Sequence, residues 1–168
     1  MRRLLALLIL LSLQAGAEVM DFPEYRWDSP VSFGSVQEFG GETYFAVYPD
    51  VLDTNQVRLE LIVITTPYDS VALIKDSGAD PRRVALSTFM DKNAQPEQIN
   101  KALFMGTTAA RQVYTSAQPR PNTTHVFQHF FENGALLTVA LRDYGGNEPG
   151  VVGEVLRSLS QTFVSTSR

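Results

Sequence analysis

Residues 124–143, THVFQHFFENGALLTVALRD, decide the fold of this chain. Two runs rich in apolar and aromatic residues flank the dipeptide Asn133-Gly134. Asn-Gly is a preferred pair for the two-residue turn of a β-hairpin, because both central residues of that turn take a positive φ. The sequence therefore predicts an antiparallel hairpin in which Phe131 lies opposite Leu136.

The predicted register divides the side chains of this hairpin between two faces. His129 is expected opposite Thr138, and Arg142 opposite His125. The face expected to be core carries Val126, Phe130, Leu137, Val139 and Leu141. The other face carries His125, Phe127, His129, Phe131, Leu136, Thr138, Ala140 and Arg142.

Further strands are predicted upstream. Gly40-Gly41 separates the strand-like residues 35–39 and 43–48, which indicates a second hairpin. Residues 57–66, VRLELIVITT, form the next strand, and Pro67 ends it because proline cannot donate to a ladder. Apolar residues fall on both faces of these strands, so we expect a sheet that is covered on both sides.

Three helices are predicted from caps and periodicity. The first begins at Pro81, after Asp80 as N-cap, and runs to about residue 91. A shorter helix is expected over residues 96–106, and a last one over residues 149–160 with an apolar stripe. Strand-like sequence lies between them at residues 110–116. This order predicts an α+β domain with a mostly antiparallel β-sheet flanked by helices.

The C-terminal part of the chain resembles the PsbP/Mog1-like α/β/α sandwich family. The resemblance rests on HVFQHFFENGALLTVALRD followed by VVGEVLRSLSQTF: an apolar antiparallel pair, a glycine-rich loop and a helix. That family includes photosystem accessory subunits, a small-GTPase-binding nuclear protein and bacterial envelope proteins. The resemblance implies a non-enzymatic accessory or interaction role, and no functional residue carries over from it.

The first 17 residues have the layout of a secretory signal peptide. Arg2 and Arg3 are followed by the apolar residues 4–13 and by Gln14-Ala15-Gly16-Ala17, which resembles a cleavage site. The apolar run is about half as long as a membrane-spanning helix. We predict cleavage after Ala17 and a secreted or periplasmic protein with no stable membrane insertion; the alternative is an uncleaved membrane anchor.

Beyond the signal peptide, the sequence predicts a lead-in over residues 18–30 and a single α+β domain over residues 31–165. The formal net charge is −4, and removal of the signal peptide would make it more negative. Nucleic acid is therefore not an expected partner, because phosphate binding needs a basic footprint. Arg82-Arg83 is the only pair of adjacent basic residues after Ala17.

Residues that could hold a metal or perform catalysis are sparse. The chain has no cysteine, which excludes thiolate catalysis, thiolate metal sites and a lipidated bacterial signal end. His125 and His129 are the only histidines, and on a strand they would lie about 13 Å apart, too far for one metal ion. Acidic residues are spread over predicted turns and caps, and no G-x-S-x-G elbow is present. We therefore expect no metal, no cofactor and no enzymatic activity.

Aromatic side chains are the remaining feature. The lead-in contains Phe22, Tyr25 and Trp27, and a segment of this kind either packs back on the domain, which we favour, or meets a partner. If it does not pack back, its exposed apolar surface marks an interaction site. The candidate interaction surface comprises Trp27, Tyr25, His125, Phe127, His129 and Phe131.

The sequence thus predicts a secreted or periplasmic accessory or protein-interaction module, whose partner is another envelope or secreted protein. One alternative is a protein that binds a small ligand or a metal, with a pocket under the helices. A second alternative is a hydrolase. An exposed apolar patch would favour the interaction module. A pocket with convergent polar groups would favour the ligand-binding protein, and a cluster of titratable side chains in a cleft would favour the hydrolase.

Overall fold

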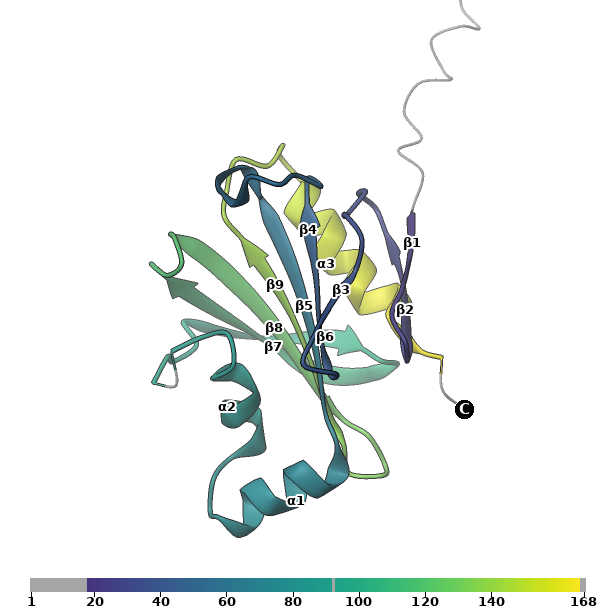
Figure 1. Ribbon diagram of the computed structural model, residues 1–168, viewed down its shortest axis with the longest axis vertical. Helices are drawn as coiled ribbons and strands as arrows, with labels where there is room; N and C mark the ends of the chain where they lie inside the picture. The colour runs from purple at the N-terminus through teal and green to yellow at the C-terminus, as the bar shows by residue number, and fades with distance from the viewer. Residues whose placement is uncertain (1–17, 92, 167–168) are drawn as a thin grey trace, which may run out of the picture.

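The computed structural model describes residues 18–91 and 93–166 and shows an α+β fold (Figure 1). The predicted signal peptide, residues 1–17, lies outside the described residues. The main sheet has seven antiparallel strands in the order β3 (Gln37–Phe39), β4 (Thr43–Tyr48), β5 (Leu59–Thr66), β9 (Leu136–Asp143), β8 (Asn122–Phe130), β7 (Thr107–Ser116) and β6 (Gln98–Phe104).

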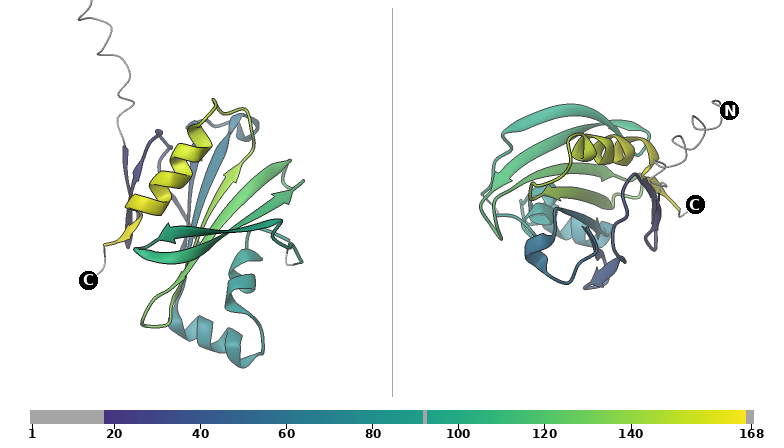
Figure 2. Two further views of the ribbon diagram at one scale, coloured as in Figure 1. Left: turned by 180° about the vertical axis from the view of Figure 1, so that it is seen from behind. Right: turned by 90° about the horizontal axis from the view of Figure 1, so that it is seen from above.

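Helices cover both faces of this sheet. The long helix α3 (Val151–Thr162) packs on one face, and the sheet curves around it (Figure 2). The shorter helices α1 (Tyr68–Asp76) and α2 (Pro81–Leu86) lie on the other face. A short 3-10 turn, η1 (Thr54–Gln56), precedes β5. The predicted class, an antiparallel sheet flanked by helices, is confirmed.

The central strand β5 is buried on both faces, as its sequence predicts. Leu61 and Val63 point to the α3 side and belong to the same core cluster as Leu159 of α3. Ile62 and Ile64 point the other way and pack in a second cluster with Leu86 of α2 and with Tyr114. Successive side chains of β5 point to opposite faces of the sheet and therefore pack in two separate cores.

The hairpin predicted over residues 124–143 forms between β8 and β9, but its register differs by one residue from the predicted register. Phe130 lies opposite Leu136 and Gln128 opposite Thr138, so Arg142 faces Thr124 and His125 faces Leu141. The reason is a three-residue loop. Phe131 N–H donates to Ala135 O at 2.9 Å, and Gly134 takes a φ of +85° that only glycine adopts readily. A turn followed by a left-handed glycine is the next most common hairpin connection.

The one-residue shift changes which side chains share a face. Phe127, Leu137, Val139 and Leu141 lie on the α3 side, whereas Val126 and Ala140 belong to the core beneath α2. Phe130 and Leu136 form a third cluster with Val71 of α1. The predicted division into a core face and a second face is wrong, because both faces are core.

Residues 96–106, predicted to be helical, instead contain strand β6, which pairs with β7 along its length. Met105 and Gly106 both take a positive φ, of 51° and 71°, and join β6 to β7 in a tight hairpin. Gly106 therefore ends a strand rather than a helix. Ile99 and Leu103 lie on one face of β6, and both side chains are exposed.

The helices of the α2 side also differ in length from those predicted. α2 begins at Pro81 as expected, with Asp80 Oδ1 accepting from Arg82 N–H at 3.0 Å, but it ends at Leu86. The chain then turns, and Phe89 and Met90 still pack against the core. α1 was not predicted, because its short sequence buries only Val71 and shows a weak apolar pattern.

The lead-in packs back on the domain, as the sequence analysis favoured. Its two strands, β1 (Glu18–Asp21) and β2 (Tyr25–Ser29), form a small antiparallel sheet with β10 (Val164–Ser165) near the other end of the chain (Figure 1). Trp27 of β2 is fully buried, and its indole N–H donates to Ser158 Oγ of α3 at 3.0 Å. This sheet therefore closes the core on the α3 side.

Candidate functional site

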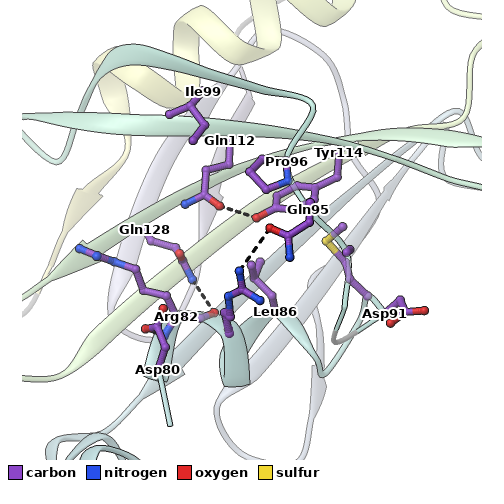
Figure 3. A pocket seen from close by; sticks show the side chains of 13 residues that line it. Asp80, Arg82, Leu86, Asp91, Gln95, Pro96, Ile99, Gln112, Tyr114 and Gln128 are labelled. Carbon is purple, nitrogen blue, oxygen red and sulfur yellow. Dashed lines mark hydrogen bonds between the residues drawn. The ribbon is translucent and has the colours of Figure 1, made fainter.

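A cavity of about 330 Å³ opens between α2 and the outer strands of the main sheet (Figure 3). We call it the α2 groove and define it by Arg82, Arg83, Ile99, Gln112, Tyr114 and Gln128. Helix α2 supplies the two arginines, and strands β6, β7 and β8 supply the others. Segments far apart in the sequence therefore meet at this groove.

Polar side chains line the sheet wall of the α2 groove. Gln112 and Tyr114 share one face of β7, and Gln112 lies opposite Val126, two residues before Gln128 on the neighbouring strand. The Tyr114 hydroxyl donates to Gln112 Oε1 (Figure 3). Gln128 Nε2 donates to Thr138 Oγ1 and to Arg82 O, both at 3.1 Å.

The carboxamide of Gln128 is only half satisfied. The residue is 9% exposed, and its Oε1 is buried with no hydrogen-bond partner among the described residues. A buried polar atom without a partner costs about 1–3 kcal/mol, so most such atoms in proteins are paired. Because Gln128 lines the open cavity, a small movement of its side chain would bring this acceptor to a ligand with an N–H or O–H donor.

Two guanidinium groups line the helix wall. The cap at Asp80 and the proline at the first helical position start α2 at this point, which places Arg82 and Arg83 in its first turn. The Arg82 guanidinium lies 5.0 Å from the centre of the Phe130 ring, and Arg83 Nη2 donates to Gln95 Oε1 at 3.2 Å. Among residues 18–91 and 93–166 the one ion pair is Glu60–Arg142, so neither arginine pairs with a carboxylate there.

Two carboxylates also belong to the lining of the groove. Asp80 Oδ1 caps α2, and Asp91 Oδ1 accepts from Asn93 N–H at 2.8 Å. Burial raises the pKa of Tyr114, and the positive charge of Arg83 opposes this shift more weakly. Tyr114 is therefore a neutral hydrogen-bond donor at neutral pH. The groove offers amides, a phenol and charges of both signs, a set that can recognise a polar ligand.

Half of the predicted interaction surface is buried. Trp27 is 0%, Tyr25 2% and Phe127 0% exposed, because the lead-in packs on α3 and Phe127 stacks on Phe104 at 5.1 Å between ring centres. The Tyr25 hydroxyl also bonds to Thr65 Oγ1 at 3.0 Å. Buried side chains present no contact surface, so this part of the prediction is wrong.

The other three residues of that set are half-buried on or next to β8. His125 and His129 share its α3 side, and the His129 ring meets the edge of Phe131 at 5.2 Å. Phe131 stacks in turn on Tyr25 at 6.3 Å. These contacts tie His129 and Phe131 to the packed lead-in rather than to an open patch.

The burial of His125 and His129 leads us to expect that the stability of the protein depends on pH. Burial lowers the pKa of His125, with a smaller contribution from the Arg111 charge, and burial also lowers the pKa of His129. The unfolded chain therefore binds protons more readily than the folded one, and their contribution to stability is lost as pH falls below about 6.5.

We expect the free energy of unfolding to decrease from about pH 7 to pH 5.5, before most carboxylates titrate. Urea unfolding at several pH values measures it, and His125→Gln should flatten the slope because the buried group no longer titrates. An unchanged slope in that variant would contradict the assignment to His125.

The described residues contain no group of three or more His, Cys, Asp or Glu side chains placed to hold a metal ion. Within the same part of the chain, no helix has the length and apolar character needed to cross a membrane.

Sequence reasoning missed most of the α2 groove. Arg82-Arg83 stood out only as a basic pair, and Gln112, Tyr114 and Gln128 were not singled out. One signal was present: Gln128 directly follows the apolar pair Val126-Phe127 in β8. A polar side chain at such a position is either exposed or has a specific buried role, and only the fold distinguishes the two.

Neither a model of a known protein family nor a curated protein sequence matches this chain. Among solved structures, a crystal structure of a protein from Bacteroides thetaiotaomicron VPI-5482 is similar, with a TM-score of 0.45 and 11% sequence identity. The match covers 86% of this chain and 46% of that one, so this chain spans less than half the length of that protein.

Proposed function

We propose that the protein is a secreted or periplasmic accessory module that works without catalysis by binding another envelope or secreted protein, and that the α2 groove is its contact site. The observation that carries this proposal is the buried Gln128 carboxamide, whose Oε1 has no partner among the described residues and which lines an open cavity. Such a group is costly in the free protein and becomes satisfied when a ligand donates to it.

An exposed apolar surface beside the groove supports a protein partner over a small molecule alone. Ile99 is 65% and Leu103 50% exposed, and both lie on one face of β6, one of the two edge strands of the main sheet. Ile99 is opposite Gln112, so this apolar surface continues directly into the groove. Exposed apolar side chains bordered by polar groups are typical of interaction sites.

We also propose that the chain is a distant member of the PsbP/Mog1-like sandwich group. The layout that supports this is an antiparallel sheet with α3 on one face and α1 and α2 on the other. Secretion by the predicted signal peptide belongs to the same proposal. Fold alone does not identify a partner, so the groove is the part of the proposal to test first.

Site-specific photocrosslinking tests the contact site. A photoreactive amino acid in place of Ile99, expressed in the protein's own host, is expected to form adducts with one or two partners, because this side chain is exposed at the groove. Mass spectrometry of the adducts identifies the partners and the crosslinked segments.

The matched control is Leu52, which is fully exposed in the loop before η1 and does not line the groove. The same photoreactive residue there should give no adduct with these partners. Equal adducts from both positions, or none from Ile99 at good expression, would contradict the proposed contact site.

A further inference from the structure

We propose that the α2 groove recognises a single carboxylate group, with Arg83 and the side-chain amide of Gln112 as its binding groups. This inference rests on the proposed function and names the chemistry of its site. The carboxylate belongs either to an acidic side chain of the partner or to a free small acid. Both sources present the same two oxygens to the groove.

The Arg83 guanidinium is available to a ligand. It carries five N–H donors, and the described residues occupy one of them, through Gln95 Oε1 at 3.2 Å. No carboxylate of the described chain forms an ion pair with it. Arg83 and Tyr114 line the same cavity, Arg83 from α2 and Tyr114 from β7. The helix wall of the groove therefore carries a positive charge with N–H donors that the described residues leave unoccupied.

Gln112 presents a fixed donor on the opposite wall. Its Oε1 accepts the hydroxyl of Tyr114, and Tyr114 is 3% exposed and so held in place by the core. This bond orients the carboxamide and leaves Nε2 without a partner in the described part of the chain. A carboxylate lying between α2 and β7 can accept from Nε2 of Gln112 and from the guanidinium of Arg83, a charge-assisted arrangement.

The acceptors of the groove define the rest of the ligand. Gln128 Oε1 needs a donor, so a ligand with an N–H group near its carboxylate satisfies both walls. Asp80 and Asp91 also line the groove, and their negative charges disfavour a polyanion such as a phosphate. A single carboxylate beside an amide N–H, as in an acidic residue of a peptide, meets these conditions.

Nuclear magnetic resonance titration of the full chain tests this inference with matched pairs of probes. One pair is a blocked tripeptide with a central glutamate and its glutamine counterpart; the other is N-acetylglycine and its amide. We expect the acidic member of at least one pair to bind and to shift the resonances of Gln112 and Gln128. Tighter binding of a neutral member than of its acidic partner would overturn the inference.

Substitutions identify the binding groups. Arg83→Gln and Gln112→Leu should each weaken binding of the acidic probe at least about tenfold, because a hydrogen bond to a charged group is lost. Arg83 is exposed, so its replacement leaves the core intact. Arg26→Gln is the matched control, since Arg26 is exposed on β2 outside the groove. Equal binding by Arg83→Gln and Arg26→Gln would overturn the assignment.

The outcomes separate this inference from the proposed function. Adducts at Ile99 without carboxylate binding overturn the inference and leave the accessory role standing. Carboxylate binding without adducts supports the inference and overturns the protein-partner role. Preference for the tripeptide identifies a partner side chain as the source, and preference for N-acetylglycine identifies a free small acid.

Discussion

Replacing Arg142 by alanine should lower the free energy of unfolding by about 3–5 kcal/mol, because it leaves the carboxylate of Glu60 without its buried partner. Arg142 is 6% exposed and donates to Glu60 Oε2 at 2.6 Å. It also donates to the Tyr144 hydroxyl at 3.2 Å and, through Nη2, to Phe89 O at 2.7 Å. The side chain therefore links the segment after α2 to the centre of the sheet.

Urea unfolding followed by circular dichroism measures this loss. The double variant Glu60→Leu with Arg142→Met is the control, because replacing both partners by apolar groups of similar size removes the uncompensated charge. Its stability should lie well above that of Arg142→Ala. If the two variants were equally unstable, lost packing rather than the unpaired carboxylate would be the cause.

Replacing Trp27 by alanine should also cost about 3–5 kcal/mol, the range for deletion of a large buried aromatic side chain. Trp27 is fully buried, meets the Phe33 ring edge-on at 5.6 Å and donates to Ser158. Its loss would open a cavity between the small sheet and α3. Thermal and urea unfolding of the variant measure the effect.

Phe39→Ala is the matched control for this experiment. Phe39 lies on the short edge strand β3 and is 74% exposed, so its removal should change stability by less than about 0.5 kcal/mol. A comparably small effect for Trp27 would show that the lead-in does not pack on the domain in solution, and would restore the alternative in which it meets a partner.

The α2 groove also depends on the hydrogen bonds of Arg142. Arg142 holds Phe89 O, and Met90, the next residue, lines the groove. The groove wall is thus positioned by a buried polar network rather than by α2 alone, since α2 is only six residues long. Loosening this network by Arg142→Ala should weaken ligand binding as well as stability.

Features that arise within a few residues could be read from the sequence. Apolar residues on both faces of β5 indicated a strand buried on both sides. The apolar stripe predicted over residues 149–160 indicated the buried side of α3, where Val155, Leu156 and Leu159 are buried. Turn chemistry located the hairpins at Gly40-Gly41 and Asn133-Gly134. These patterns are local because periodicity and positive φ are properties of short segments.

Only the tertiary structure determined the register of the β8–β9 hairpin and whether residues 98–104 form a helix or a strand. The loop after Phe131 has three residues rather than two, and this moved every cross-strand pair of the hairpin by one. Residues 98–104 have a sequence compatible with a helix, and their pairing with β7 makes them a strand. Backbone hydrogen bonds to a distant strand outweigh a weak local preference.

The sequence by itself determined the α+β class, the two-sided sheet, the absence of thiol chemistry and the acidic net charge. The tertiary structure decided where the aromatic lead-in lies and which polar residues meet. Arg83, Gln112 and Gln128 belong to three different elements, and no short stretch of sequence contains two of them. A site of this kind arises only when long-range strand pairing and the packing of α2 bring its walls together. These contacts join residues that are distant in the sequence, so no local pattern predicts them.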